Sequence, residues 1–164
     1  MKLTPLYGYD DYVADWTAKL IPHARRGFGK CRALGILDEN GWLIAGVVYH
    51  NWDPDAGIVE ISGASISPQW LQRNSIGWIY QPPFRLWGCQ MVVQRVPADN
   101  ERIQRILASY GYSLIKMPRL FGRDRDGVIC CLTVEDWVAN RFNQRFQHHV
   151  ADMTPVQLEL KEAA

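Results

Sequence analysis

Apolar positions spaced three and four residues apart follow a short extended segment at the start of the chain. They are Tyr9, Tyr12, Val13, Trp16 and Leu20. This spacing places the five side chains on one face of a helix. Proline has no backbone N–H and disrupts helices, so we expect this helix to end before Pro22. Residues 2–7 predict a short strand, which Pro5 confines to the edge of a sheet.

The next part of the chain, residues 33–66, has the apolar runs and polar turns that are typical of β-strands. Residues 33–38 and 42–51 are two apolar runs joined around Asn40-Gly41. Asn-Gly between apolar runs is typical of a tight hairpin, and we predict a type I′ turn with positive φ at both residues. Residues 58–66 follow a second polar turn and predict a third strand. The three segments together indicate an antiparallel meander.

The second half of the chain alternates strands and helices. Its expected strands are residues 89–96, 112–120 and 128–134, and its expected helices are residues 100–110 and 135–149. Asp99 or Asn100 supplies an N-cap for the first of these helices, and Gly111 suits its C-terminal end. Strands joined through helices imply a parallel pair. The sequence thus predicts an α+β fold with a mixed, mostly antiparallel sheet.

Residues 71–84 combine two signals that rarely occur together. The first half is polar and bears a glycine, as expected of a helix start whose free backbone N–H groups hold an anion. Pro82-Pro83 follows within three turns. We therefore expect a break or kink near residue 81 and a second helical turn after it.

Length and composition restrict the class of protein. The chain has 164 residues, 48% of them hydrophobic, and a net charge of +1. We expect one domain over residues 1–150 and a C-terminal tail over residues 151–164, and the charge alone favours no class of partner. Neither a signal peptide nor a membrane-spanning run is evident, so we expect a cytoplasmic protein without membrane contact. The four cysteines lack CxxC spacing, which indicates free thiols and no metal site.

Two motifs point to a known family: QRNSIG at residues 72–77, and Asn100 followed by Gly111-Tyr112. Together they resemble the motifs of the GNAT superfamily of acyl-CoA-dependent N-acetyltransferases. The first is QRNSIG, which is similar to the family's pyrophosphate loop with Ser75 in place of the middle glycine. The second is Asn100 followed by Gly111-Tyr112, which is similar to the family's asparagine and its later Gly-Phe. The resemblance covers residues 2–137 and implies a GNAT-like mixed sheet with a central splayed parallel pair, flanked by helices.

The resemblance implies acetyl-CoA (coenzyme A) as the cofactor. The expected contacts are Ala64, Ser65, Ile66, Gln72, Arg73, Asn74, Ser75, Ile76, Gly77 and Asn100. The first three lie on a strand edge that would pair with the pantetheine arm, and the helix start would hold the pyrophosphate on its N–H groups. Gly77 is expected to permit close approach to the cofactor because it has no Cβ. Asn100 has an alternative role as a simple N-cap.

The resemblance also implies a general base on the third meander strand, and Glu60 is the carboxylate there. Cross-strand pairing is the alternative role for Glu60. His50 is a second candidate because imidazole titrates near neutral pH, although a structural histidine fits as well. Tyr49 and His50 point to opposite faces of a regular strand, so at most one of them faces a cleft. Leu107 replaces the tyrosine that the family uses as acid, which leaves Tyr110 as a candidate acid or a core side chain.

Basic side chains flank the expected acceptor side. Arg25, Arg26, Lys30 and Arg119 are expected to bind the substrate, in which case the acceptor is anionic or belongs to an anionic polymer. A solvated rim, partly neutralised by nearby aspartates, is the alternative. The acceptor is a small-molecule or a macromolecular amine, and the sequence leaves both a nucleic acid and a homodimer open.

Three functions stay open at this stage. The first is an acyl-CoA-dependent N-acyltransferase that transfers the acyl group directly in a ternary complex. The second is a nucleic-acid (adenine) modification enzyme, because the basic loop and the Tyr49-His50 strand loosely resemble GNAT-like, Mom-type DNA-modification proteins of bacteriophages. That resemblance implies a bacterial or phage-encoded protein. The third is a non-catalytic acyl-CoA-binding or interaction protein, which Leu107 and Ser75 favour.

Overall fold

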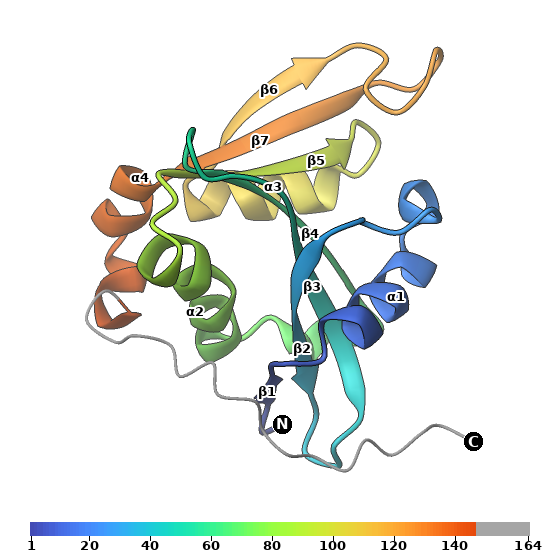
Figure 1. Cartoon of the computed structure of the whole chain (residues 1–164). Coiled ribbons are helices and arrows are strands. Elements are labelled where there is room, and N and C mark those ends of the chain that lie inside the picture. The colour runs from blue at the N-terminus through green and yellow to red at the C-terminus, as the bar shows by residue number, and fades with distance from the viewer. Residues whose placement is uncertain (147–164) are drawn as a thin grey trace.

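Seven strands form one mixed sheet in the computed structural model, which describes residues 1–146 (Figure 1). The strands are β1 (Thr4–Leu6), β2 (Cys31–Leu37), β3 (Leu43–Asp53), β4 (Ile58–Ser65), β5 (Met91–Pro97), β6 (Ser113–Met117) and β7 (Gly127–Thr133). Their order across the sheet is β1-β2-β3-β4-β5-β7-β6. β4 and β5 run parallel, and every other neighbouring pair runs antiparallel. This arrangement confirms the predicted α+β fold with a central parallel pair.

Helices cover both faces of the sheet. They are α1 (Asp10–Leu20), α2 (Arg73–Gln81), α3 (Glu101–Tyr110) and α4 (Val134–Ala139). α1 packs against β2 and β3 on one face, whereas α2, α3 and α4 lie over the other (Figure 1). Within residues 1–146, no helix is long and apolar enough to cross a membrane. The expected tail over residues 151–164 lies outside the described part of the chain.

The buried face of α1 differs from the predicted one. Its buried residues are Val13, Ala14, Thr17 and Ala18. Tyr12 and Leu20, which were expected on that face, are 43% and 41% exposed. A Cβ at Gly46 of β3 would overlap Thr17, so α1 lies close to the sheet and only small side chains fit at the contact. The apolar spacing therefore identified the helix correctly but not its rotation.

The hairpin between β2 and β3 also differs from its prediction. Gly41 has a φ of 82°, but Asn40 is not among the residues with positive φ, so the turn is not type I′. The carbonyl of Asp38 accepts from the N–H of Gly41, and its carboxylate accepts from the N–H groups of Asn40 and Trp42. Asp38 thus holds a longer loop in which only the glycine needs the left-handed conformation.

The predicted change near residue 81 is confirmed. α2 gives way to a π-helical turn, Pro82–Leu86, which the N–H of Trp87 closes by donating to the carbonyl of Pro82 at 3.0 Å. Pro82 and Pro83 have no N–H to donate to the preceding turn, so regular α-helical bonding fails there. The prolines therefore alter the helical bonding, while the backbone at Gln81 and Pro82 keeps helical dihedral angles.

The last predicted helix is shorter than residues 135–149. α4 has six residues, and Asn140 after it is extended, with φ and ψ of −73° and 116°. The Asn140 side chain donates to the carbonyl of Tyr110 and accepts from the N–H of Phe142. These two bonds hold residue 140 outside the helix, and a separate 3₁₀ turn, Arg141–Phe146, follows. Residues 147–149 lie outside the described part of the chain.

Candidate active site

The parallel pair at the centre of the sheet opens into a V. β4 and β5 are paired only through Ile58, Val59 and Glu60, opposite Met91, Val92 and Val93. Beyond that point β4 continues to Ser65 in partnership with β3 alone. Because successive residues of a strand direct their N–H and C=O groups to alternate edges, this part of β4 has unpaired backbone groups on its β5 side. The opening therefore creates an internal strand edge.

A cleft of about 790 Å³ occupies this opening. Its walls include Ser62, Gly63, Ala64 and Ser65 of β4 and Gln94, Arg95, Val96 and Pro97 of β5. α2 contributes Ile76, Ile79 and Tyr80, and α3 contributes Ile103, Ile106, Leu107 and Tyr110. Leu20, Ile21, Pro22 and His23 line it from the other face of the sheet. Elements on both faces of the sheet therefore line the cleft. The side formed by α2 and α3 is mostly apolar, and the side near His23 is more polar.

The first turn of α2 has two backbone donors to which the helix itself offers no partner. Gln72 and Ser75 form a capping box, in which the Gln72 side chain accepts from the N–H of Ser75 and Ser75 Oγ accepts from the N–H of Gln72 at 2.8 Å. Arg73 and Asn74 occupy the next positions, and a helix offers no partner to its first N–H groups. The Ser75 hydroxyl also donates to the carbonyl of Trp70 at 2.6 Å. Ser75 therefore fixes the helix start, and its hydroxyl is already engaged.

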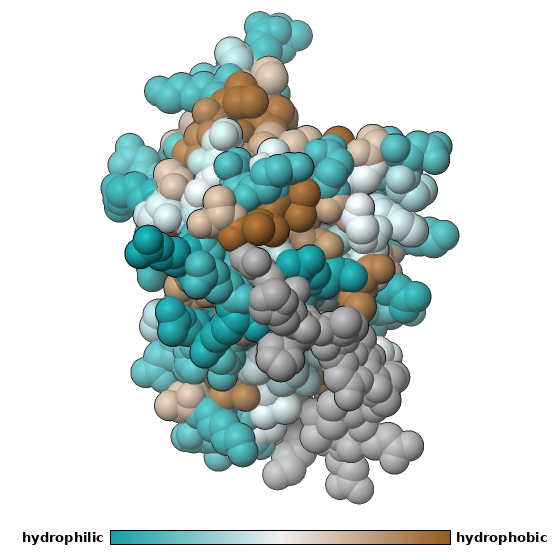
Figure 2. Space-filling view, turned by 90° about the vertical axis from the view of Figure 1, so that its left-hand side faces the viewer, coloured by the Kyte–Doolittle hydropathy of each residue, from teal (hydrophilic) through white to brown (hydrophobic). Residues whose placement is uncertain are grey.

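Two arginines lie beside this helix start. The Arg73 guanidinium is 5.0 Å from the ring centre of Phe142, and Arg145 donates to Asn74 Oδ1 at 2.7 Å. The sequence predicted Arg73 at this place but missed Arg145, which lies 71 residues away from Asn74 along the chain. The surrounding face, which carries α2 and α4, is largely hydrophilic with smaller apolar areas (Figure 2). The helix start is thus a positively charged, exposed site.

A close contact within the chain accounts for the glycine at position 77. A Cβ at this position would overlap the ring of Phe146, which is 9% exposed and packs against the helix. The side-chain amide of Gln81 donates to the carbonyl of Phe146 at 3.2 Å and holds that segment in place. The absent Cβ therefore admits an aromatic ring of this chain. The structure gives Gly77 no contact with the cleft.

The strand residues expected at the cofactor divide into two groups. Ala64 and Ser65 line the cleft, whereas Ile66 is 63% exposed and does not. Asn100 lines the cleft and also caps α3, because its side chain accepts from the N–H of Ile103 at 3.4 Å. Both roles considered for Asn100 are therefore compatible in one geometry. Ile76 lines the cleft as well.

Glu60 is held on both carboxylate oxygens. Oε1 accepts from Arg95 Nε at 2.6 Å and Oε2 accepts from Asn51 Nδ2 at 2.8 Å. Asn51 has a φ of 49° within an irregularity of β3, which brings its amide to Glu60. The Glu60 side chain is 12% exposed and is not part of the cleft wall. Both carboxylate oxygens are occupied by partners from neighbouring strands, so Glu60 has the geometry of its alternative, paired role.

His50 is bonded to a residue that the sequence did not single out. Its Nε2 lies 2.9 Å from Ser62 Oγ, and its ring centre is 4.9 Å from that of Phe28. Burial lowers the pKa of His50 and Arg95 lowers it further, while Glu60 raises it. Neutral imidazole is thus favoured near pH 7. The alternation of a strand predicts from sequence that Ser62 and Glu60 share one face. That Ser62 lies beside His50 follows only from the register of β3 against β4, which the sequence does not show.

The tyrosines in the expected site have structural partners. Tyr49 is 2% exposed, and its hydroxyl donates to the carbonyl of Ile79 at 2.7 Å. Tyr110 lines the cleft, but its hydroxyl donates to Asn143 Oδ1 at 2.6 Å, and burial raises the pKa of Tyr110. Neither hydroxyl is free to act as an acid. The predicted catalytic role of Tyr49 is not supported, because this side chain does not reach the cleft.

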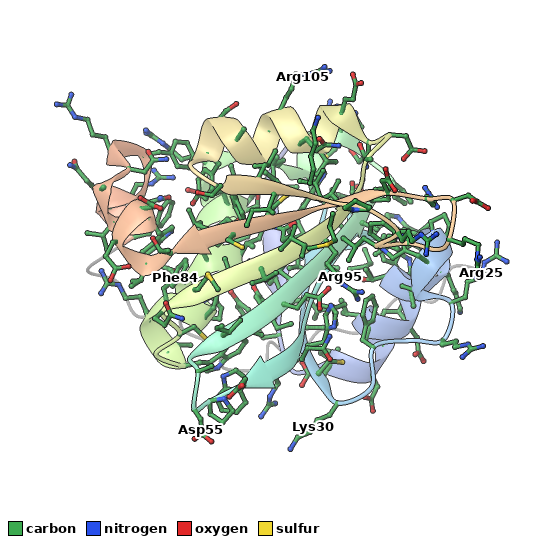
Figure 3. The ribbon with its side chains drawn as sticks, turned by 90° about the horizontal axis from the view of Figure 1, so that it is seen from above. Arg25, Lys30, Asp55, Phe84, Arg95 and Arg105 are labelled. Atoms are coloured by element: carbon green, nitrogen blue, oxygen red, sulfur yellow. The ribbon has the colours of Figure 1, made fainter. Side chains whose placement is uncertain are left out.

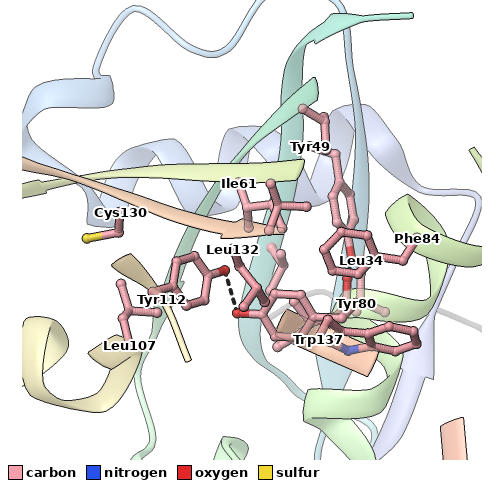
Figure 4. Packing of buried hydrophobic residues seen from close by; sticks show 14 of the residues in the cluster. Leu34, Tyr49, Ile61, Tyr80, Phe84, Leu107, Tyr112, Cys130, Leu132 and Trp137 are labelled. Atoms are coloured by element: carbon pink, nitrogen blue, oxygen red, sulfur yellow. Dashed lines mark hydrogen bonds between the residues drawn. The ribbon is translucent and has the colours of Figure 1, made fainter. Parts of the chain in front are cut away.

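Two further tyrosines, Tyr80 and Tyr112, form a hydrogen-bonded pair next to the apolar side of the cleft. The hydroxyls of Tyr80 and Tyr112 are 2.7 Å apart, and Gln94 donates to the Tyr112 hydroxyl at 2.7 Å (Figure 4). Tyr80 and Gln94 line the cleft, whereas Tyr112 is buried. No local pattern predicts this contact, because the two tyrosines lie 32 residues apart along the chain. The pair fixes α2 against β5 and β6.

Two loops meet at the polar side of the cleft. The ring centres of His23 and Phe121 are 4.6 Å apart, and the Arg125 guanidinium lies 5.9 Å from the Phe121 ring. His23, Arg95 and Arg125 line the cleft there. Arg125 pairs with Asp99 at 3.5 Å. Burial lowers the pKa of His23, and Arg95 and Arg125 lower it further against an opposing effect of Glu60. Both arginines have carboxylate partners, Glu60 and Asp99, so the charges at this side of the cleft are largely balanced.

The predicted substrate residues, three arginines and Lys30, lie outside the cleft wall. Arg25, Arg26 and Lys30 are exposed on the loop before β2, and Arg25 and Lys30 project outward (Figure 3). Arg119 is exposed on the β6–β7 loop, where its N–H donates to Asp126 Oδ1 at 3.0 Å. None of the four contributes to the cleft wall. Arg95, which does line the cleft, was not among the predicted contacts.

Known structures with this architecture are N-acetyltransferases, although the sequence matches no family model and no curated protein. A spermidine N-acetyltransferase SpeG chimera from Vibrio cholerae and hSSAT superposes with a TM-score of 0.68, at 12% identity over 85% of this chain and 100% of that one. Mutant forms of the spermidine/spermine N-acetyltransferase SpeG give 0.61 at 14% identity, over 67% and 68% of the two chains. The ribosomal-protein-S5-alanine acetyltransferase of Vibrio fischeri gives 0.56 at 15%, over 65% and 63%. The chain therefore has the GNAT fold, the architecture of these acetyltransferases.

Proposed function

We propose that the protein is an acyl-CoA-dependent N-acyltransferase that uses acetyl-CoA and an amine acceptor. The observation that carries this proposal is the open edge of β4, which faces a cleft beside the first turn of α2. The extended pantetheine arm of acetyl-CoA carries amide groups, which can pair with a strand edge. Its anionic pyrophosphate can bind the free N–H groups at a helix start. The likeness in fold to acetyltransferases supports the same assignment.

The residues present fit such a cofactor. The pantetheine amides would pair with backbone groups of β4 between Ser62 and Ser65. The pyrophosphate would take the N–H groups of Arg73 and Asn74, with the guanidinium of Arg145 beside them. Bound there, acetyl-CoA supplies an activated acyl group as a thioester. The exposed side chains at this helix start leave room for the remaining, anionic part of the molecule.

Direct transfer of the acyl group to an amine has three requirements. The V must hold the thioester, a base must receive the proton of the amine, and the thiolate must leave. His50 is the better base, since Glu60 is held by Arg95 and Asn51. Leu107 and the engaged hydroxyl of Tyr110 offer no proton. We propose that the thiolate leaves unprotonated, which its pKa near that of a cysteine thiol, about 8.5, allows.

The acceptor is proposed to carry an anionic group. Arg95 and Arg125 line the cleft at its polar side, and guanidinium groups bind carboxylates and phosphates in pairs of hydrogen bonds. Both guanidinium groups already have a carboxylate partner, Glu60 or Asp99, with which the anionic group of the acceptor would compete. The SpeG neighbours act, by name, on spermidine, a polycation, and the proposed acceptor differs from it in charge.

Modification of an amine on a nucleic acid is the second candidate. The contact of His23 with Phe121 brings two arginine-bearing loops together, and the exposed Arg25, Arg26 and Arg119 surround it. Cationic loops would follow a phosphate backbone, and an aromatic pair would stack on an extruded base. This arrangement is what a phage-type, Mom-like enzyme on the same fold requires.

A turnover assay tests the proposal. The protein is incubated with acetyl-CoA and amines of four classes: polyamines, amino sugars, carboxylate- or phosphate-bearing amines, and DNA. Free thiol and product mass are followed. We expect thiol release that depends on an anionic acceptor. Release with DNA, together with DNA affinity that falls steeply with salt, would establish the second candidate instead. Binding of acetyl-CoA without turnover on any class would identify a non-catalytic acyl-CoA-binding protein.

A further inference from the structure

We propose that Ser62 is a proton relay, which receives the proton of the attacking amine and passes its own proton to His50. The inference rests on the proposed acyl transfer but assigns a residue that the transfer itself does not require. Ser62 would be the catalytic residue that touches the acceptor. His50 would act only through it, as the final proton acceptor.

The position of Ser62 follows from the opening of the sheet. β4 and β5 are paired as far as Glu60, so Ser62 lies just beyond the point where the strands separate. It is half-buried and forms part of the cleft wall. The thioester would lie along this part of β4, so an attacking amine must come close to the Ser62 hydroxyl. Ser62 thus places a hydroxyl at the apex of the V.

His50 cannot meet the acceptor directly. It is 5% exposed, lies outside the cleft wall, and is covered by the ring of Phe28. Its Nε2 nevertheless lies 2.9 Å from Ser62 Oγ, within hydrogen-bond distance. Ser62 is therefore the route between the cleft and the imidazole. Without a relay, a base buried this way would be isolated from the reaction.

The surroundings of His50 favour a neutral ring that accepts a proton. Cys31 of β2 is its cross-strand neighbour on one side, and Glu60 of β4 is its neighbour on the other. Arg95 of β5 pairs with Glu60 and offsets that carboxylate. Burial raises the pKa of the Cys31 thiol, so Cys31 stays neutral near pH 7. Glu60 and Arg95 together carry no net charge. The pair therefore does not hold a proton on the His50 imidazole, although the carboxylate lies near the ring.

The proposed step conserves atoms and charge. The amine nitrogen attacks the carbonyl carbon of the thioester, the C–N bond forms, and the C–S bond breaks as the thiolate leaves. The nitrogen gives its proton to Ser62 Oγ while the Ser62 proton moves to His50 Nε2. The products are the amide, the thiolate and an imidazolium, which later loses its proton to solvent. No co-reactant beyond acyl-CoA and the amine is needed.

A nuclear magnetic resonance experiment tests the relay on the free protein. His50 must carry its proton on Nδ1 when neutral, because Nε2 has to accept from Ser62. The protein is labelled with ¹⁵N at its four histidines, and His50→Gln assigns the His50 signals. We expect a protonated Nδ1 and an unprotonated Nε2 near pH 8, and Ser62→Ala should change the Nε2 shift. A dominant Nε2–H form would overturn the proposal, because that ring would donate to Ser62 and could not receive its proton.

Kinetics then separate the relay from the proposed function. With the best acceptor, Ser62→Ala is expected to lower kcat by about 10²-fold while acetyl-CoA binding is unchanged, as for the loss of a positioned base. Ser62→Thr keeps a hydroxyl and should restore most of the rate. His50→Gln should remove the acid limb of the pH profile. Full activity of Ser62→Ala would overturn the relay and leave the proposed function intact. Absence of acetyl-CoA binding by the wild-type protein would instead overturn the proposed function, and the tautomer result would still decide whether His50 can accept from Ser62.

Discussion

The Tyr49 hydroxyl donates a 2.7 Å hydrogen bond to the carbonyl of Ile79, which is the carbonyl that residue 83 would serve in an α-helix. Pro83 has no N–H, so Tyr49 of β3 supplies the donor that the prolines remove from α2. Ile79 also lines the cleft. The hydrogen bond from Tyr49 therefore connects α2 to the sheet at the carbonyl that Pro83 leaves without a donor. Tyr49 had been predicted from the sequence to be catalytic.

This relationship predicts the effect of Tyr49→Phe. The variant keeps the aromatic volume but leaves the buried carbonyl of Ile79 without this partner. We expect the free energy of unfolding to fall by about 1–3 kcal/mol. Urea denaturation measures it, with Tyr12→Phe as the control, because Tyr12 is 43% exposed. Equal stability of the Tyr49 variant and the wild-type protein would show that the bond contributes nothing.

Gly77→Ala should destabilise the protein even though alanine favours helices. The added Cβ overlaps the ring of Phe146, and such overpacking costs about 1–3 kcal/mol, which exceeds the gain of about 1 kcal/mol in helix propensity. Phe146→Leu combined with Gly77→Ala should recover part of the loss in a double-mutant cycle. If Gly77 instead serves the cofactor, Gly77→Ala would weaken acetyl-CoA binding and leave stability unchanged or improved.

Arg73 and Arg145 are expected to strengthen acetyl-CoA binding through the charge of the helix start. The double variant Arg73→Ala, Arg145→Ala should raise Kd about tenfold at low salt, since exposed charge contacts contribute less than about 1 kcal/mol each. Calorimetric titration at two salt concentrations measures this. Arg105→Ala is the matched control, because Arg105 lies on the outer side of α3 (Figure 3). An equal change in the control would mean that only net charge matters.

The stability of the fold should depend on pH through His50. An unfolded imidazole titrates near pH 6.5, and burial lowers the pKa of His50 in the folded protein. The folded state therefore binds this proton less readily. The stabilising effect is complete above pH 6.5 and is lost as the pH falls from there towards the lower folded value.

His50→Gln removes this contribution. The decrease in the free energy of unfolding from about pH 7.5 to about pH 5 should be smaller in the variant than in the wild-type protein. His23→Gln is a useful comparison, because burial lowers the pKa of His23 too but its side chain is exposed. Unfolding curves at each pH decide the point, and parallel pH profiles for His50→Gln and the wild-type protein would contradict it.

The sequence predicts most of the fold because its signals are local. Apolar spacing located α1 and α3, and Gly111 ended α3 with a φ of 119° as a C-terminal glycine should. The rotation of α1 could not be predicted, since it depends on Gly46, which lies in another element. The shorter α4 had a similar cause, because Asn140 is held by the carbonyl of Tyr110.

The site was harder to predict for a related reason. Local motifs identified the α2 start and Asn100, whose capping groups lie within four residues of one another. Ser62 and Arg145 were missed because their roles come from contacts with residues 12 and 71 positions away. Gly77 matched a motif position, yet its missing side chain serves the packing of Phe146.

Hydrogen exchange with and without acetyl-CoA tests the central claim most directly. The proposed function places the pantetheine arm on the β4 edge and the pyrophosphate on the first turn of α2. We predict that saturating acetyl-CoA slows amide exchange at residues 62–65 and 73–76, while exchange in α1 is unchanged. Unchanged exchange in both segments at saturating acetyl-CoA would contradict the account.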